Sequence, residues 1–208
     1  MRGYSLIAME NKLSGENQAW AKLVTLDPAE VCRRTTAHFD EQAETYTLKS
    51  YGCEISVSPR DKKIFSSSPN GNALLDKLDS ALTLLWYLAS AHSLPLSGKL
   101  INPESLPGGQ IFVKGTHILP LAQLAEKYAH APEEFIKSGK MWGGETLDYG
   151  DAALQLWPLP QVPTTLILRT ADEEFPALVN LLLDSNCQFQ LPTDIIWSTC
   201  MMSATILL

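Results

Sequence analysis

The chain has 208 residues, 45% hydrophobic and 19% charged, which is enough apolar surface for a folded globular core. Its formal net charge is −7 and its basic residues are dispersed, which disfavours nucleic acid and anionic membranes as partners. The four cysteines form no CxxC pair, and no apolar run reaches the ~20 residues that a bilayer requires. These features favour a soluble, cytoplasmic protein.

The first third of the chain changes from helical to strand-like patterning. Residues 1–15 lack periodicity and are expected to form a loose tail before a single domain over residues 16–208. The run from Asp27 to Glu30 is typical of a helix start, with an Asp cap, a Pro in the first turn and a Glu placed for a capping box. Alternating apolar residues then predict strands with one buried face. The expected elements are helices over 17–24 and 27–38, a strand over 45–57 with a bulge or turn near 50–52, and a strand over 63–66.

The clearest predicted element is an apolar helix over residues 72–92, after a loop over 66–71. Its apolar residues recur at helical spacing and form a broad face, which predicts the central helix of the core. Truncation of Leu82 or Leu85 to Ala is expected to cost roughly 2–5 kcal/mol. The residues of this face are Leu74, Leu75, Leu78, Leu82, Leu85, Trp86, Leu88 and Ala89.

The remainder of the chain predicts a long connection, further helices and a second block of strands. Residues 93–109 are rich in Pro and Gly, and such a long loop is expected to contain short 3₁₀ pieces or to line a functional site. Because the two strand blocks are separated by helices, we predict an α+β fold. Its mixed, largely antiparallel sheet is expected to pack on the central apolar helix and the other helices. The elements expected here are helices over 117–129, 132–139 and 194–208 and strands over 152–157, 163–169 and 178–183.

Acidic residues gather around the last two predicted strands. Asp172, Glu173 and Glu174 follow one strand, Asn180 lies in the next, and Asp184 ends it. If these strands are neighbours, the carboxylates could meet at one end of the sheet and bind a cation or act as acid and base. The simpler interpretation is a solvated turn, with Asp184 as a turn or capping residue. The histidines form no HxxxH or HExxH pair, so no metal site is predicted.

A series of short motifs, in a fixed order from about residue 16 to the end, resembles an uncharacterised family, the domain of unknown function numbered thirty-seven eighty-six. The resemblance implies occurrence in anaerobic bacteria and archaea, and some members carry a ferredoxin-type iron–sulfur domain, but no activity comes with it. This chain lacks a clustered Cys-x-x-Cys run, so a cluster of its own is not expected. The recurring polar residues are the candidate ligand-binding residues Lys99, Asp151, Asp172, Glu173, Glu174, Asn180 and Asp184. The motifs are Leu84–Ala91, Pro95–Lys99, Leu106–Gly109, Gly143–Gly144, Gly150–Ala152, Leu159–Pro163, Asp172–Ala177, Asn180–Ser185 and Leu191–Thr193.

Three hypotheses about function remain open, and the chain's own cofactor is unknown. The first is a non-catalytic accessory or ligand-binding domain in anaerobic metabolism, with a protein partner that carries an iron–sulfur or corrinoid centre. The second is an enzyme that uses the acidic cluster with a divalent cation or a polar substrate. The third is a homodimer built on the last helix, because Trp197, Met201, Met202 and Ile206 give that segment more apolar surface than one face needs.

Overall fold

A computed structural model describes residues 14–77, 79–112 and 118–208 of the chain. Its mixture of helices and antiparallel strands confirms the predicted α+β class. The helices are a segment over residues 14–24, α2 (Pro28–Thr35), α3 (Pro69–Leu75), α4 (Ser80–Ser90), α5 (Leu121–Lys127), α6 (Pro132–Met141), α7 (Cys187–Gln190) and α8 (Thr193–Thr205), with 3₁₀ turns η1 (Pro103–Ser105) and η2 (Gly109–Phe112). The strands are β1 (His38–Asp40), β2 (Thr45–Ser50), β3 (Cys53–Ser58), β4 (Lys63–Phe65), β5 (Leu100–Ile101), β6 (Glu145–Leu147), β7 (Ala152–Leu159), β8 (Val162–Arg169) and β9 (Leu178–Asp184).

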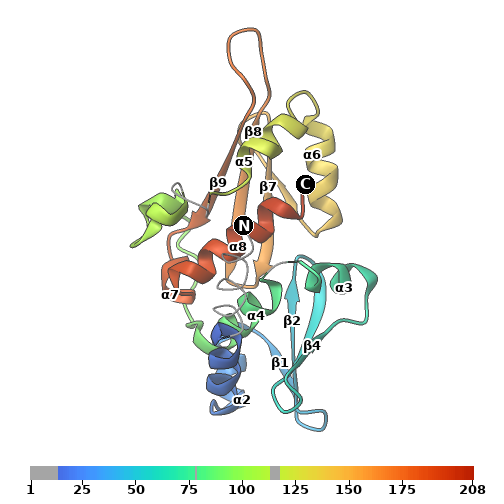
Figure 1. Ribbon diagram of the computed structural model, residues 1–208, viewed down its shortest axis with the longest axis vertical. Coiled ribbons are helices and arrows are strands. Elements are labelled where there is room, and N and C mark those ends of the chain that lie inside the picture. The colour runs from blue at the N-terminus through green and yellow to red at the C-terminus, as the bar shows by residue number, and fades with distance from the viewer. Residues whose placement is uncertain (1–13, 78, 113–117) are drawn as a thin grey trace, which may run out of the picture.

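The strands form two separate sheets in which every neighbouring pair is antiparallel. The first sheet has the order β1-β2-β3-β4, and the second has the order β5-β9-β8-β7-β6. The antiparallel character was expected, whereas the division into two sheets was not. The first sheet lies in the lower half of Figure 1 and the second in the upper half, with α4 between them and α8 across the second sheet.

The turn between β2 and β3 joins the two sheets. The Tyr51 amide donates a hydrogen bond to the carbonyl of Trp157 on β7 at 2.7 Å, and the Ser50 hydroxyl donates to the carbonyl of Pro158, also at 2.7 Å. The Tyr51 hydroxyl lies 2.7 Å from the Ser203 hydroxyl on α8, and both side chains are buried. The first sheet is therefore attached to the second sheet and to the last helix by buried hydrogen bonds.

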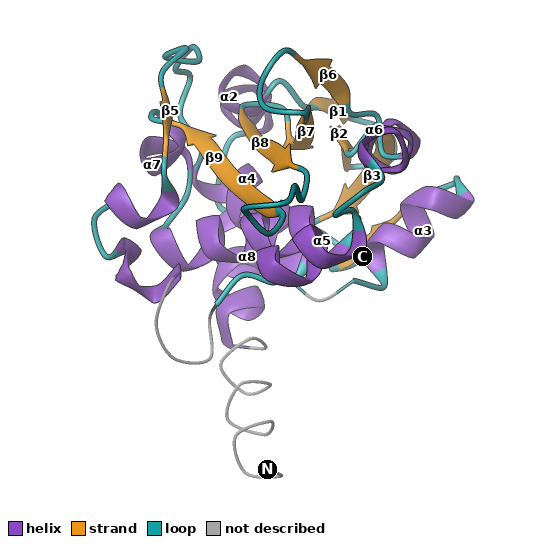
Figure 2. Cartoon of the chain, turned by 90° about the horizontal axis from the view of Figure 1, so that it is seen from above, coloured by secondary structure: helices purple, strands orange, loops and turns teal. Residues whose placement is uncertain are grey.

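A single apolar core cluster includes side chains from both sheets and from α4 and α8. Helices α5 and α8 lie on one side of strands β7, β8 and β9 (Figure 2). Leu84, Leu85 and Leu88 of α4 are fully or almost fully buried, which confirms this segment as part of the core. None of the helices in the described ranges is long and apolar enough to cross a membrane.

Several predicted boundaries are wrong. The expected helix over 72–92 is two helices, α3 and α4, because Asp79 adopts a left-handed conformation with φ of 64° just before α4. Helix α2 ends at Thr35 because the next residue, Thr36, has φ of 57°, so the chain enters β1 where the helix was expected to continue. The loop predicted over 66–71 already contains the start of α3. The predicted tail over residues 1–15 lies mostly outside the described residues, and its last two residues belong to the helix over 14–24. Leu78 and His117 also lie outside the described residues.

Candidate functional site

The acidic candidate residues lie at opposite ends of the second sheet. Strands β8 and β9 are an antiparallel pair joined by residues 170–177, which contain the acidic run from Asp172 to Glu174. This run lies where β9 begins, whereas Asp184 lies where β9 ends. The expected meeting of these carboxylates at one end of the sheet is therefore wrong, because adjacent strands of a hairpin run in opposite directions.

Asp184 anchors the loop that precedes β5. Its side chain is only 4% exposed and accepts hydrogen bonds from the Ser97 amide at 3.1 Å, the Ser97 hydroxyl at 3.0 Å, the Gly98 amide at 2.9 Å and the Asn186 amide at 2.9 Å. Burial alone would raise the pKa of Asp184, but the hydrogen bonds from Asn186, Ser97 and Gly98 outweigh burial and lower it. Lys99 lies next to this loop with its side chain exposed, and its carbonyl accepts from the Ser185 amide at 2.9 Å.

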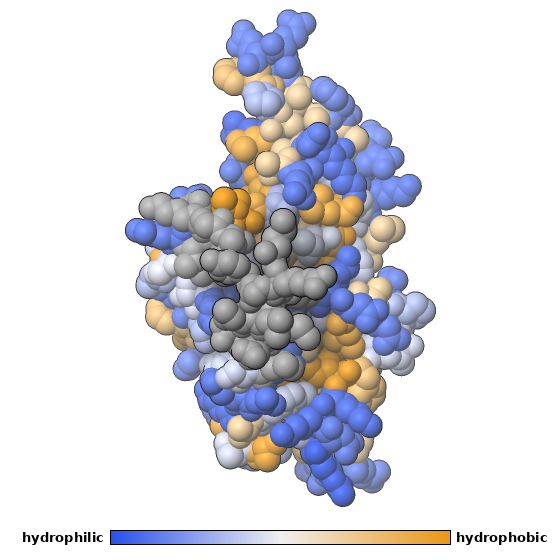
Figure 3. Space-filling model, viewed as in Figure 1, coloured by the Kyte–Doolittle hydropathy of each residue, from blue (hydrophilic) through white to orange (hydrophobic). Residues whose placement is uncertain are grey.

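Asp151 and Asp172 shape the loops at the other end of the sheet. The Asp151 carboxylate accepts from the Thr170 amide at 2.7 Å and from the Thr170 hydroxyl at 2.8 Å, and these bonds lower its pKa. Asp172 accepts from the amides of Glu174 at 2.9 Å and Phe175 at 2.7 Å, as the turn interpretation predicts. The β8–β9 loop held in this way projects beyond the body of the molecule at the top of Figure 1. The outermost part of this projection is hydrophilic in Figure 3.

An open cavity of about 360 Å³ lies between the start of α6 and the β6–β7 hairpin. Three carboxylates line it, those of Glu133, Asp148 and Asp151, together with Tyr149 and the apolar side chain of Ile136. Sequence reasoning singled out only Asp151 of this group. Within the described ranges, His, Cys, Asp and Glu side chains form no group of three or more that could hold a metal ion.

Burial keeps the cysteine thiols protonated. Cys53, Cys187 and Cys200 are buried, and burial is the largest cause that raises the pKa of each thiol. For Cys187, burial and then the nearby Asp184 carboxylate raise the pKa to about 12. Since the thiolate is the reactive form, these residues behave as small core side chains.

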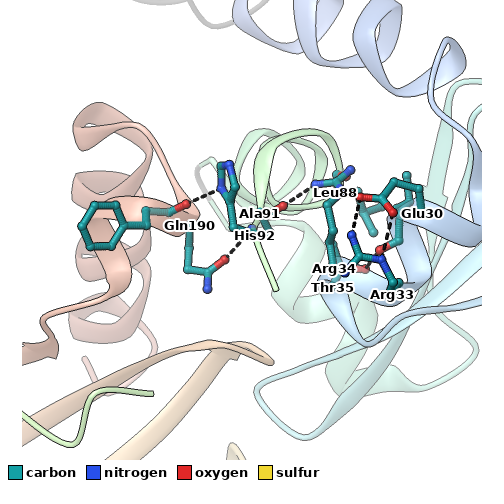
Figure 4. Close-up of polar contacts among 10 residues, drawn as sticks. Glu30, Arg33, Arg34, Thr35, Leu88, Ala91, His92 and Gln190 are labelled. Atoms are coloured by element: carbon teal, nitrogen blue, oxygen red, sulfur yellow. Dashed lines mark hydrogen bonds and ion pairs between the residues drawn. The ribbon is translucent and has the colours of Figure 1, made fainter. Parts of the chain in front are cut away.

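A second polar cluster joins α2, α4 and α7 (Figure 4). The Arg34 guanidinium donates hydrogen bonds to the carbonyls of Ala91 and Leu88, so it caps the C-terminus of α4. The His92 amide donates to the Gln190 side-chain oxygen at 2.8 Å. These bonds satisfy backbone groups at helix ends, so the cluster serves the fold.

The apolar residues that suggested a dimer helix contribute to the core. Met202 in α8 and Ile206 directly after it are buried, and Trp197 and Met201 pack against the core cluster. Trp86 and Trp142 also pack against this cluster. Helix α8 is apolar on most sides because it packs against several other elements.

The two antiparallel sheets and the core that they share define the molecule as an α+β domain. The family model described as "Domain of unknown function (DUF3786)" matches residues 27–205, and the chain belongs to this family. No curated protein and no solved structure matches the chain.

Proposed function

We propose that this chain is a non-catalytic accessory or ligand-binding domain that acts by binding a protein partner. One observation carries the proposal: the acidic candidates Asp151, Asp172 and Asp184 each accept hydrogen bonds from the chain's own loops. A catalytic carboxylate must instead direct its oxygen atoms at a substrate or at a proton in transfer. Here the carboxylates fix the shape of two exposed loops, which suits a surface that another protein recognises.

The cellular setting of this proposal comes from the family resemblance. We propose a cytoplasmic role in anaerobic metabolism, with an iron–sulfur or corrinoid centre on the partner. The alternative, an enzyme that uses the carboxylates jointly, has less support because Asp172 and Asp184 occupy opposite ends of β9.

An anoxic pull-down tests this function. The purified chain is immobilised and exposed to an anaerobic lysate, and the retained proteins are identified and their visible absorption spectra recorded. We expect a stoichiometric partner with iron–sulfur or corrinoid absorption. Retention of neither a partner nor a cofactor would contradict the proposal. So would turnover of a substrate that Asp172→Asn abolishes while the variant stays folded.

A further inference from the structure

In the described part of the chain, one face of the second sheet is less deeply buried than the other, and it carries both apolar and polar side chains. Along β9 the side chains of Val179, Leu181 and Leu183 are buried in the core, whereas Leu178 is 50% exposed and Leu182 is half-buried. This alternation shows that the two faces of the strand have different surroundings. Helices α5 and α8 account for the buried side (Figure 2).

Cross-strand pairing extends the apolar face over the neighbouring strands. Ile167 on β8 pairs with Asn180, and Thr165 pairs with Leu182. Within the described part of the chain, Ile167 and Leu182 are half-buried hydrophobic residues that do not pack against the core cluster. We call this surface the open sheet face; it consists of Leu147, Gln155, Ile167, Leu178, Asn180 and Leu182, which surround the buried residues Ala153 and Thr165.

Acidic residues border the open sheet face at one end. The β6–β7 and β8–β9 loops meet there through the bonds between Asp151 and Thr170. Phe175 in the β8–β9 loop is 66% exposed, and the loop leads directly into Leu178. The exposed carboxylates of these strands and loops include those of Glu145, Asp148, Asp172, Glu173 and Glu174. Arg169, which pairs with Leu178, is an exposed cation on the face itself.

We propose that the open sheet face and its acidic border are the docking surface for a protein partner whose own surface has an apolar centre bordered by Lys and Arg. Interfaces combine a buried apolar centre with a polar rim, and complementary charge speeds encounter and excludes wrong partners. An anionic membrane surface would be repelled by the same carboxylates. The proposal rests on the accessory function above and specifies the surface and the chemistry of the partner.

Binding of a defined probe tests the surface. The probe is a fluorescently labelled amphipathic peptide of Lys and Leu, and its anisotropy is measured against the folded chain over a series of salt concentrations. The test variants are Leu178→Arg and Glu173→Lys. The matched controls are Phe65→Arg, which alters a strand residue of the first sheet that is 49% exposed, and Glu41→Lys, which alters an exposed carboxylate in a distant turn.

We expect saturable binding of one peptide per chain, with affinity about tenfold lower in Leu178→Arg and a shallower salt dependence in Glu173→Lys. Both controls should match the wild type. Equal affinities in all variants, or equal losses in test and control variants, would overturn the proposal. A dimer in light scattering that Leu178→Arg dissociates would also overturn it, because a second copy would then cover the face.

The pull-down of the native partner distinguishes an error in the proposed docking surface from an error in the proposed accessory function. If Leu178→Arg retains the partner as well as the wild-type chain does, the docking surface is wrong while the accessory function stands. If the wild-type chain retains no partner, the accessory function itself fails.

Discussion

At the scale of single residues, Asp184 is the side chain whose loss should affect the fold most. Its buried carboxylate receives four hydrogen bonds from Ser97, Gly98 and Asn186. An amide of the same size has only one acceptor atom and places an NH₂ group against these donors. We expect Asp184→Asn to lower the free energy of unfolding by roughly 2–3 kcal/mol in urea denaturation. Asp172→Asn, at an exposed turn that Asn also supports, should change it by less than about 0.5 kcal/mol.

The same residue gives the protein a component of acid sensitivity. The folded state holds the pKa of Asp184 below its usual value of 3.8, so the unfolded chain binds the proton more tightly. The contribution of Asp184 to the free energy of unfolding is therefore fully present when the pH is above 3.8. It is lost as the pH falls through the lower pKa of the folded state. Unfolding measured from neutral pH to about pH 3 should therefore show a smaller acid-induced loss in Asp184→Asn than in the wild type. Parallel curves for the two proteins would contradict this role.

At the scale of elements, the packing of α4 distinguishes two leucines that the sequence pattern treats alike. Leu85 is completely buried, whereas Leu82 is partly buried at the edge of the core cluster. Leu85→Ala should lower the free energy of unfolding by roughly 2–5 kcal/mol, through lost burial and the cavity left behind. Leu82→Ala should cost clearly less, because fewer of its atoms leave water on folding. Equal shifts in thermal melts of the two variants would show that α4 packs differently.

The sequence predicted elements better than it predicted their ends. Period-two alternation located β2 and β3, and the phase change near Tyr51 correctly indicated the turn between them. Helix breaks at Thr36 and Asp79 were not foreseen, because a left-handed residue other than glycine depends on tertiary contacts rather than on local propensity. Strands of two or three residues, such as β5 and β6, carry too few residues for periodicity to show.

The candidate site was predictable in part. The eight residues from 170 to 177 are too few for a crossover between parallel strands, so the hairpin and the separation of Asp172 from Asp184 could have been inferred from chain length. The Asp172 turn was also readable from the sequence. Thr170 lies 19 residues along the chain from its partner Asp151, and Ser97 and Gly98 lie 87 and 86 residues from their partner Asp184. No local sequence pattern indicates such pairings.

At the scale of the whole molecule, the two sheets depend on a close backbone contact. Gly52, in the β2–β3 turn, and Gly143, between α6 and β6, face each other, and both have positive φ. A Cβ atom added to Gly143 would lie 2.9 Å from the Gly52 Cα and 3.1 Å from its amide nitrogen. Because the neighbouring Tyr51 is bonded to β7 and α8, a shift here would also disturb the buried hydrogen bonds between the sheets.

We therefore expect Gly143→Ala to be far more destabilising than Gly98→Ala. Gly98 also has a positive φ, of 71°, but no atom lies within 4 Å of its added Cβ. Both variants share the left-handed conformational cost of about 1–2 kcal/mol, and Gly143→Ala adds roughly 1–3 kcal/mol of steric strain. For a chain of this length, each kcal/mol lowers Tm by about 2–4 °C. Circular dichroism and tryptophan fluorescence should give the same lowered Tm, since both sheets share one core. Equal melting of the two variants would mean that the glycine contact does not hold the sheets together.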